Sequence, residues 1–174
     1  MNPVLYFLRS SEQKIATDML KYVYKLNELD KEVKDFSQLD KFHKFYGLTD
    51  KDLGLYALLE NKIVGAVWIR LLEESKIPTL CLAVIPEFTK QGIGSFMMKQ
   101  LLEEAGGIFT QIQVSILEND SVDVFFEKLN FKKVKDSQKF NVIYKENTID
   151  MVVNVSNKVV KRPTDGYDPR RWMD

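Results

Sequence analysis

The segment Leu82–Ala105, LAVIPEFTKQGIGSFMMKQLLEEA, limits what this chain can fold into more than any other stretch. An apolar run predicts a strand that ends before Pro86, and the apolar spacing beyond the loop predicts a helix. The loop between them carries Gly92 and Gly94. Such a loop places free main-chain N–H groups at the positive end of a helix dipole, which attracts phosphate groups. The segment therefore predicts a site for a phosphorylated cofactor.

Length and composition favour one soluble domain. At 174 residues the chain can bury a single core without disulfides or metals. Its 25 Lys and Arg balance 25 Asp and Glu, so the net charge gives no reason to expect nucleic acid or a membrane as partner. No apolar stretch approaches the roughly 20 residues of a membrane-spanning helix, and the N-terminus lacks the apolar segment of a secretory signal. With Cys81 as the only cysteine, we expect a cytoplasmic protein.

The N-terminal half predicts a strand, two helices and a hairpin. Ser10 or Ser11 can cap the first helix, and Gly47 can end the second. Asn61 tolerates the left-handed backbone that a tight hairpin turn needs. In chain order, we predict a strand at Val4–Leu8, helices at Glu12–Leu26 and Ser37–Tyr46, and strands at Leu53–Leu59 and Ile63–Leu72.

The C-terminal half predicts further strands around the segment described first, and so a mixed α/β fold. Ile112, Val114 and Ile116 alternate with polar residues, which indicates a strand with one polar face. Asn119 or Asp120 can cap a short helix after that strand. We predict strands at Thr79–Ile85, Gln111–Ile116, Phe131–Lys135 and Ile149–Val155, and a helix that ends at Ala105.

The last residues differ from the rest of the chain. Pro163, Gly166 and Pro169 argue against regular structure, whereas Trp172 argues against pure disorder. We therefore expect a domain over residues 1–155 and an irregular tail over residues 156–174 that docks on a second subunit, which gives a homodimer.

Two motifs carry a resemblance to a known family. The first motif of that family is a valine, a proline two residues on, and then Q/RxxGxG/A. In VIPEFTKQGIGS it is matched by Val84, Pro86, Gly92 and Gly94. At the expected separation, ENDSVDVFFEKLNFKKV resembles an asparagine, a helix, a tyrosine, and a closing glycine and phenylalanine. The second motif agrees at these positions: Asn119, Glu127, Lys128, Leu129 and Phe131. On these residues the chain resembles the GNAT superfamily of N-acetyltransferases.

This resemblance implies a central mixed sheet flanked by helices and the use of acetyl-CoA as co-substrate. It implies transfer of an acetyl group to the primary amine of a small molecule or peptide by direct attack. The pantetheine would lie along one strand, and main-chain N–H groups of the glycine loop would hold the pyrophosphate. The implied cofactor-binding residues are Leu82, Ala83, Val84, Thr89, Lys90, Gln91, Gly92, Ile93, Gly94, Ser95, Asn119 and Phe126.

Two positions depart from the family pattern. The Arg or Gln that opens the glycine motif is Thr89, so we expect weaker cofactor binding, which Lys90 restores in part. The tyrosine that often serves as general acid is Phe126, which has no proton to give. Ser115 and Tyr167 are candidate replacements as proton donors, and Asn119 is a further candidate for the catalytic site.

The remaining functional residues stay open at this stage. Glu73, Glu74 and Asp120 are possible general bases, but carboxylates at strand ends usually face water. The residues predicted to line the acceptor pocket are Tyr56, Trp68 and Arg70. Trp68 fits the core equally well, and Arg70 would favour an acceptor that bears a carboxylate. His43 has no cysteine or second histidine at ligand spacing, so we predict no metal site.

A competing interpretation is a binding module that kept the fold and the coenzyme A groove but lost turnover. The two non-standard positions, Thr89 and Phe126, favour it. An enzyme and a module differ in whether any amine releases free thiol from acetyl-CoA.

Overall fold

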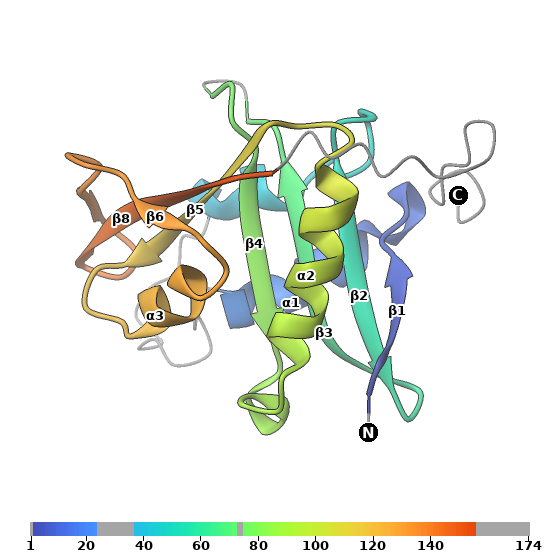
Figure 1. Cartoon of the computed structure of the whole chain (residues 1–174). Helices are drawn as coiled ribbons and strands as arrows, with labels where there is room; N and C mark the ends of the chain where they lie inside the picture. Colours follow the sequence, from blue (N-terminus) through green and yellow to red (C-terminus); the bar gives the residue numbers. More distant parts are fainter. Residues whose placement is uncertain (1, 24–36, 73–74, 156–174) are drawn as a thin grey trace.

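The computed structural model describes residues 2–23, 37–72 and 75–155 (Figure 1). A single eight-stranded sheet runs through it in the order β1-β2-β3-β4-β5-β8-β6, and β7 pairs with β8 off this path. Every strand pair is antiparallel except β4 with β5, which is parallel. The predicted mixed α/β class is confirmed. Tyr167 and the rest of the tail lie outside the described residues, as do Glu73 and Glu74.

The first four strands form an antiparallel meander. They are β1 (Val4–Phe7), β2 (Leu53–Leu59), β3 (Lys62–Arg70) and β4 (Thr79–Val84). Glu60 and Asn61 join β2 to β3 with φ values of 50° and 65°. Two consecutive positive φ values are those of the tight turn that matches strand twist. The predicted hairpin is therefore confirmed, with its turn at the expected residues.

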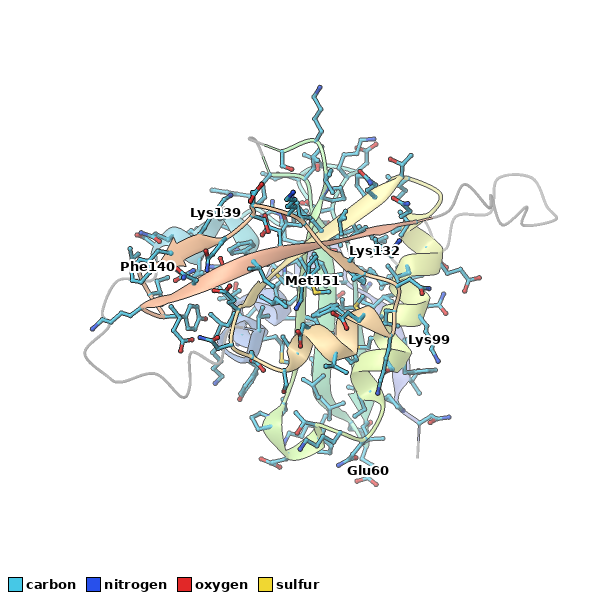
Figure 2. The ribbon with its side chains drawn as sticks, turned by 60° about the vertical axis from the view of Figure 1, so that its left-hand side comes forward. Glu60, Lys99, Lys132, Lys139, Phe140 and Met151 are labelled. Carbon is cyan, nitrogen blue, oxygen red and sulfur yellow. The ribbon has the colours of Figure 1, made fainter. Side chains whose placement is uncertain are left out.

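The other strands are β5 (Gln111–Leu117), β6 (Lys132–Lys133), β7 (Lys139–Asn141) and β8 (Glu146–Asn154). The strand predicted at Phe131–Lys135 is therefore much shorter. Strand β7 was not predicted, because its residues are largely exposed and show no alternation of buried and polar positions. Phe140 of β7 is 64% exposed and lies at the outer side of the molecule (Figure 2).

Helices cover both faces of the sheet. Helix α1 (Gln13–Val23) packs on β3 and β4, whereas α2 (Ile93–Ala105) packs on β2, β3 and β4 from the opposite face (Figure 1). Helix α3 (Val122–Glu127) lies on the same side as α2. Two buried cores result, one on each face, and alternate residues of the central strands enter them in turn. We call these the α1-face core and the α2-face core.

The segment predicted as a second helix, Ser37–Tyr46, contains instead the 3₁₀ helix η3 (Ser37–Phe42). Side chains from β3 take the carbonyl groups that a longer α-helix would use. Trp68 donates from Nε1 to the carbonyl oxygen of Phe42 at 2.7 Å, and Arg70 donates to the carbonyl oxygens of Lys41, Lys44 and Phe45. These tertiary hydrogen bonds override the local helical pattern.

Candidate functional site

Strands β4 and β5 share one register pair and separate toward their C-terminal ends (Figure 1). Their parallel register contains one pair, Thr79 with Gln113, although the strands have six and seven residues. On their outer sides β4 pairs with β3 and β5 pairs with β8 along their length. Between these described strands, no register pair joins Leu82–Val84 to Ser115–Leu117. An extended group can therefore add its own hydrogen bonds at this splay, as a peptide adds to an open sheet edge.

The glycine loop follows β4 and leads into α2. It contains a 3₁₀ turn, η4 (Pro86–Phe88), and two left-handed positions, Lys90 with φ 61° and Gly92 with φ 83°. Among the hydrogen bonds of the described residues, none has a main-chain N–H between Lys90 and Ser95 as its donor. We call these six N–H groups the cradle. Grouped donors of this kind, at the start of a 13-residue helix, form an anion-binding concavity.

The two glycines of the loop have different reasons to be there. Gly92 needs a glycine because its φ is positive, although an added Cβ would meet no atom within 4 Å. At Gly94 an added Cβ would lie 3.5 Å from Cζ of Phe125 and 3.8 Å from Cγ2 of Val84, which are ordinary contacts. Gly94 therefore lies between the splayed strand β4 and helix α3. The protein itself would accommodate a methyl group there, so the glycine leaves room for a close approach from outside.

The polar side chains of the loop mostly stabilise its own turn. Thr89 donates from Oγ1 to the carbonyl oxygen of Pro86 at 2.9 Å, and Gln91 donates from Nε2 to that of Glu87 at 3.3 Å. Lys90 is exposed. Thr89 thus occupies its hydroxyl in the turn, and Lys90 is the charged side chain available to an anion at the cradle.

Helix α3 brings Phe125, and not Phe126, to the loop. Phe126 is 3% exposed and packs edge to face against Phe125 and Phe131, with ring centroids 5.1 Å apart in each case. The sequence did not single out Phe125, because both phenylalanines fit the apolar side of a short helix. Helix α3 ends at Glu127, and the turn after it closes at Asn130, where φ is 71°, while Phe131 donates its N–H to the carbonyl oxygen of Phe126. Asn130 thus takes the left-handed position at which the resemblance implied a closing glycine.

The candidates on and after β5 lie at the open end of the splay. Ser115 is half-buried on the α1 face and pairs across the sheet with Asp150 of β8. Asn119 is exposed beyond the end of β5. Asp120 accepts the N–H of Val122 at 3.3 Å from its Oδ1. The N-cap of α3 is Ser121, without a side-chain cap hydrogen bond, so the prediction that Asn119 or Asp120 caps this helix is wrong.

The three residues predicted for the acceptor pocket share the α1 face but differ in their contacts. Trp68 is 0% exposed and belongs to the α1-face core. Arg70 pairs with Asp52, with 3.1 Å between Nε and Oδ1, and the two side chains are only 14% and 3% exposed. Both residues therefore have structural roles. Tyr56 is half-buried and stacks on Tyr6, so it alone of the three remains in our proposal for the acceptor side.

Two titratable groups on the α1 face have shifted pKa values. Partial burial raises the pKa of the Tyr56 phenol, and the carboxylate of Glu12 raises it further. Burial lowers the pKa of His43, although Asp40 opposes the shift. His43 contacts Thr17, with 2.9 Å between Nδ1 and Oγ1, and so joins the turn after η3 to α1. Within residues 2–23, 37–72 and 75–155, no group of three or more His, Cys, Asp or Glu side chains gathers as metal ligands would.

Solved acetyltransferase structures share this fold over nearly their whole length. A GNAT acetyltransferase from Streptococcus pneumoniae is 16% identical, with a TM-score of 0.64 over 87% of this chain and 98% of its own. The ribosomal-protein-S18-alanine N-acetyltransferase of Escherichia coli is 16% identical, with a TM-score of 0.62 over 90% and 95%. A phosphinothricin acetyltransferase from Sinorhizobium meliloti, in complex with acetyl-CoA, is 14% identical, with a TM-score of 0.68 over 98% and 97%. The fold is that of the acyl-CoA N-acyltransferases.

A family model described as the acetyltransferase (GNAT) domain matches residues 51–133. The matched part runs from the start of β2 to the end of β6 and includes both motifs. Over these residues the chain matches the GNAT acetyltransferase domain, and the resemblance drawn from the sequence is confirmed there. No curated protein matches the sequence significantly. None of the helices in the described part of the chain is long and apolar enough to span a bilayer.

Proposed function

We propose that the protein is an acetyl-CoA-dependent N-acetyltransferase that acts on the primary amine of a small molecule or peptide. The cradle beside the splay carries this proposal, because it offers six main-chain donors that no described protein group uses. A site with unused donors and a close-approach glycine fits a diphosphate linked to an extended chain.

The residues of the site divide between the two parts of acetyl-CoA. The main chain of Leu82–Val84 would pair with the pantetheine arm across the splay, in place of the missing β5 partner. The N–H groups of the cradle, with Thr89 beside them, would hold the pyrophosphate, and Lys90 would add a positive charge. Asn119 and Phe126 remain proposed cofactor contacts from the family resemblance.

Direct transfer needs a positioned amine, a donor for the oxyanion and a proton for the leaving sulfur. A main-chain N–H at Leu82–Val84 would donate to the oxyanion. Phe126 cannot protonate the leaving sulfur, because its side chain has no hydroxyl and lies in an aromatic cluster. The proton must come from another group, for which Ser115 on the α1 face is one candidate.

The fold does not identify the acceptor of this protein. Two structural neighbours are named for ribosomal protein S18 and for phosphinothricin, so the fold does not select one kind of acceptor. We place the acceptor on the α1 face, near Tyr56. A carboxylate-bearing acceptor is no longer favoured, because Arg70 is already paired with Asp52.

A charge reversal beside the cradle tests the proposal. Lys90→Glu and Lys99→Glu change the net charge equally, but Lys99 lies further along α2 on its exposed side (Figure 2). Calorimetric titration with acetyl-CoA should give a Kd raised about tenfold for Lys90→Glu, since an attraction becomes a repulsion, and a Kd within about twofold of wild type for Lys99→Glu. Equal effects of the two variants on the Kd, or no binding of acetyl-CoA by wild type, would refute the proposal that the cradle holds the pyrophosphate.

The second candidate is a coenzyme A-binding module without turnover, which Thr89 and the buried Phe126 favour. A screen of primary amines for thiol release from acetyl-CoA separates the two. Binding of acetyl-CoA with no thiol release from any amine supports the module, whereas release supports the enzyme.

The proposal also takes residues 1–155 as the catalytic domain and residues 156–174 as an irregular tail. We propose that the tail docks on a second copy of the chain and that the protein works in the cytoplasm. Sedimentation of the chain with and without the tail tests the dimer.

A further inference from the structure

Strand β1 forms one end of the sheet, and among the described residues its outer side has no neighbouring strand (Figure 1). Leu8 donates its N–H to the carbonyl oxygen of Gly54 at 2.8 Å and continues the register of β1 with β2. Because the main-chain groups of an antiparallel strand alternate in direction, Leu5 and Phe7 direct their N–H and C=O groups away from β2. No described group hydrogen bonds to them on that side, so β1 is an open edge.

The side chains of this edge are apolar and partly exposed. Val4 is 56% exposed and Tyr6 is 36% exposed, and residues 2–8 carry no charge. Tyr6 is positioned by its stack on Tyr56, with ring centroids 5.6 Å apart. Proteins commonly protect an open strand edge with lysine. The other end of the sheet has this protection, since β6 consists of two exposed lysines, whereas β1 does not.

We propose that β1 pairs with β1 of a second copy of this chain, antiparallel and about a twofold axis that passes through Tyr6. The two eight-stranded sheets then join into one. An edge without charge suits an identical edge, because no like charges meet across the axis. The axis stands perpendicular to the sheet, so the α1 faces of both copies lie on the same side.

The register follows from the main-chain groups that are free to bond. Pairing Leu5 with Leu5 would place Phe7 opposite Pro3, which has no N–H to donate. Pairing Phe7 with Phe7 would place Leu5 opposite Arg9. There the N–H already bonds to Oε1 of Glu12 at 3.0 Å, and the carbonyl oxygen accepts the N–H of Glu12 at 2.9 Å. When Leu5 of each copy pairs with Phe7 of the other, every outward group of both residues gains a partner.

In this register Tyr6 lies opposite Tyr6 of the second copy. The two form a pair without hydrogen bonds, in which Cα atoms lie about 4.5 Å apart. With Tyr56 beside each of them, the tyrosines make one row across the α1 face, and aromatic cross-strand pairs stabilise antiparallel sheets. Strand β1 alone is short of the roughly 20 residues that each side of a stable interface contributes. The dimer therefore needs this pairing and also the contact proposed above for residues 156–174.

Single cysteines in the full chain test the register. Tyr6→Cys places two thiols across the axis, at a Cα separation that a disulfide can bridge. Val4→Cys is the matched control, because Val4 is more exposed but lies opposite Leu8, so the two copies of Val4 are about 14 Å apart. The native Cys81 is buried. Mild oxidation should convert Tyr6→Cys to a covalent dimer, with a yield about tenfold or more above that of Val4→Cys.

Opposite charges at position 6 provide a second measurement. Tyr6→Glu and Tyr6→Lys each place like charges across the axis, so each should sediment as a monomer. An equimolar mixture should recover the dimer, which a variant that failed to fold could not do. Phe140→Glu and Phe140→Lys are the controls and should sediment like wild type, because Phe140 is 64% exposed at the other end of the sheet (Figure 2).

Three results would overturn the inference. The first is a wild-type protein that sediments as a monomer. The second is a disulfide yield of Val4→Cys that equals or exceeds that of Tyr6→Cys. The third is a mixture of Tyr6→Glu and Tyr6→Lys that stays monomeric although circular dichroism shows both variants to be folded.

Discussion

Alanine substitutions at Gly92 and Gly94 should change stability in opposite directions. At Gly92 an alanine must keep φ near 83°, which costs about 1–2 kcal/mol for an L-residue. Its lower entropy in the unfolded chain returns about 0.4–1 kcal/mol. No atom lies within 4 Å of the added Cβ, so no steric cost enters. The free energy of unfolding should therefore fall by about 1 kcal/mol.

At Gly94 an alanine should raise the free energy of unfolding. Its φ lies outside the left-handed region, and the added Cβ would make ordinary contacts with Phe125 and Val84. Alanine in the first turn of α2 is a better helix former, so unfolding should cost about 0.5–1 kcal/mol more. Thermal denaturation should separate the two variants, since 1 kcal/mol moves the Tm of a chain this size by about 2–4 °C. Two shifts of the same sign, or a Gly92→Ala variant as stable as wild type, would refute the loop conformation.

Four further measurements test other parts of the structure. Asp52→Asn should lower the free energy of unfolding by about 2–4 kcal/mol in urea, because it leaves the half-buried Arg70 without its counter-charge; a loss below 1 kcal/mol would contradict the pairing. Phe126→Tyr should lower it by about 1–3 kcal/mol, since the new hydroxyl enters an aromatic cluster; unchanged stability would show that this position reaches solvent. The folded-state pKa of His43 lies below 6.5, so stability should fall as the pH drops below about 6.5, and His43→Gln should flatten that dependence; an identical pH profile in both proteins would argue against it. Truncation after Val155 should convert the dimer into a monomer in sedimentation experiments. An unchanged oligomeric state would contradict the docking role of the tail.

The strands and the glycine loop were predictable because their signals are local. The hairpin between β2 and β3 follows from two apolar runs and from Asn61, whose side chain tolerates the turn. The loop before α2 follows from Pro86, Gly92 and Gly94, each of which acts through its own backbone. Strand β7 gave no such signal, because Phe140 is exposed and its strand exists only through pairing with β8.

The side-chain partners of the site were not predictable in the same way. Trp68 and Arg70 are two residues apart on β3 and so share one face of the sheet, but their partners are carbonyl groups about 25 residues away in the chain, which no local pattern reveals.

The most direct test of the account follows the amide groups of the loop while the cofactor binds. In a titration of isotope-labelled protein with acetyl-CoA, nuclear magnetic resonance should report the largest shifts at the N–H groups of Lys90–Ser95, with further changes at Leu82–Val84. Signals from α1 and from the turn at Glu60 and Asn61 should stay nearly still. If the resonances of Lys90–Ser95 do not move when acetyl-CoA is bound, or if the largest changes cluster elsewhere, these donors do not hold the diphosphate and the proposed activity loses its basis.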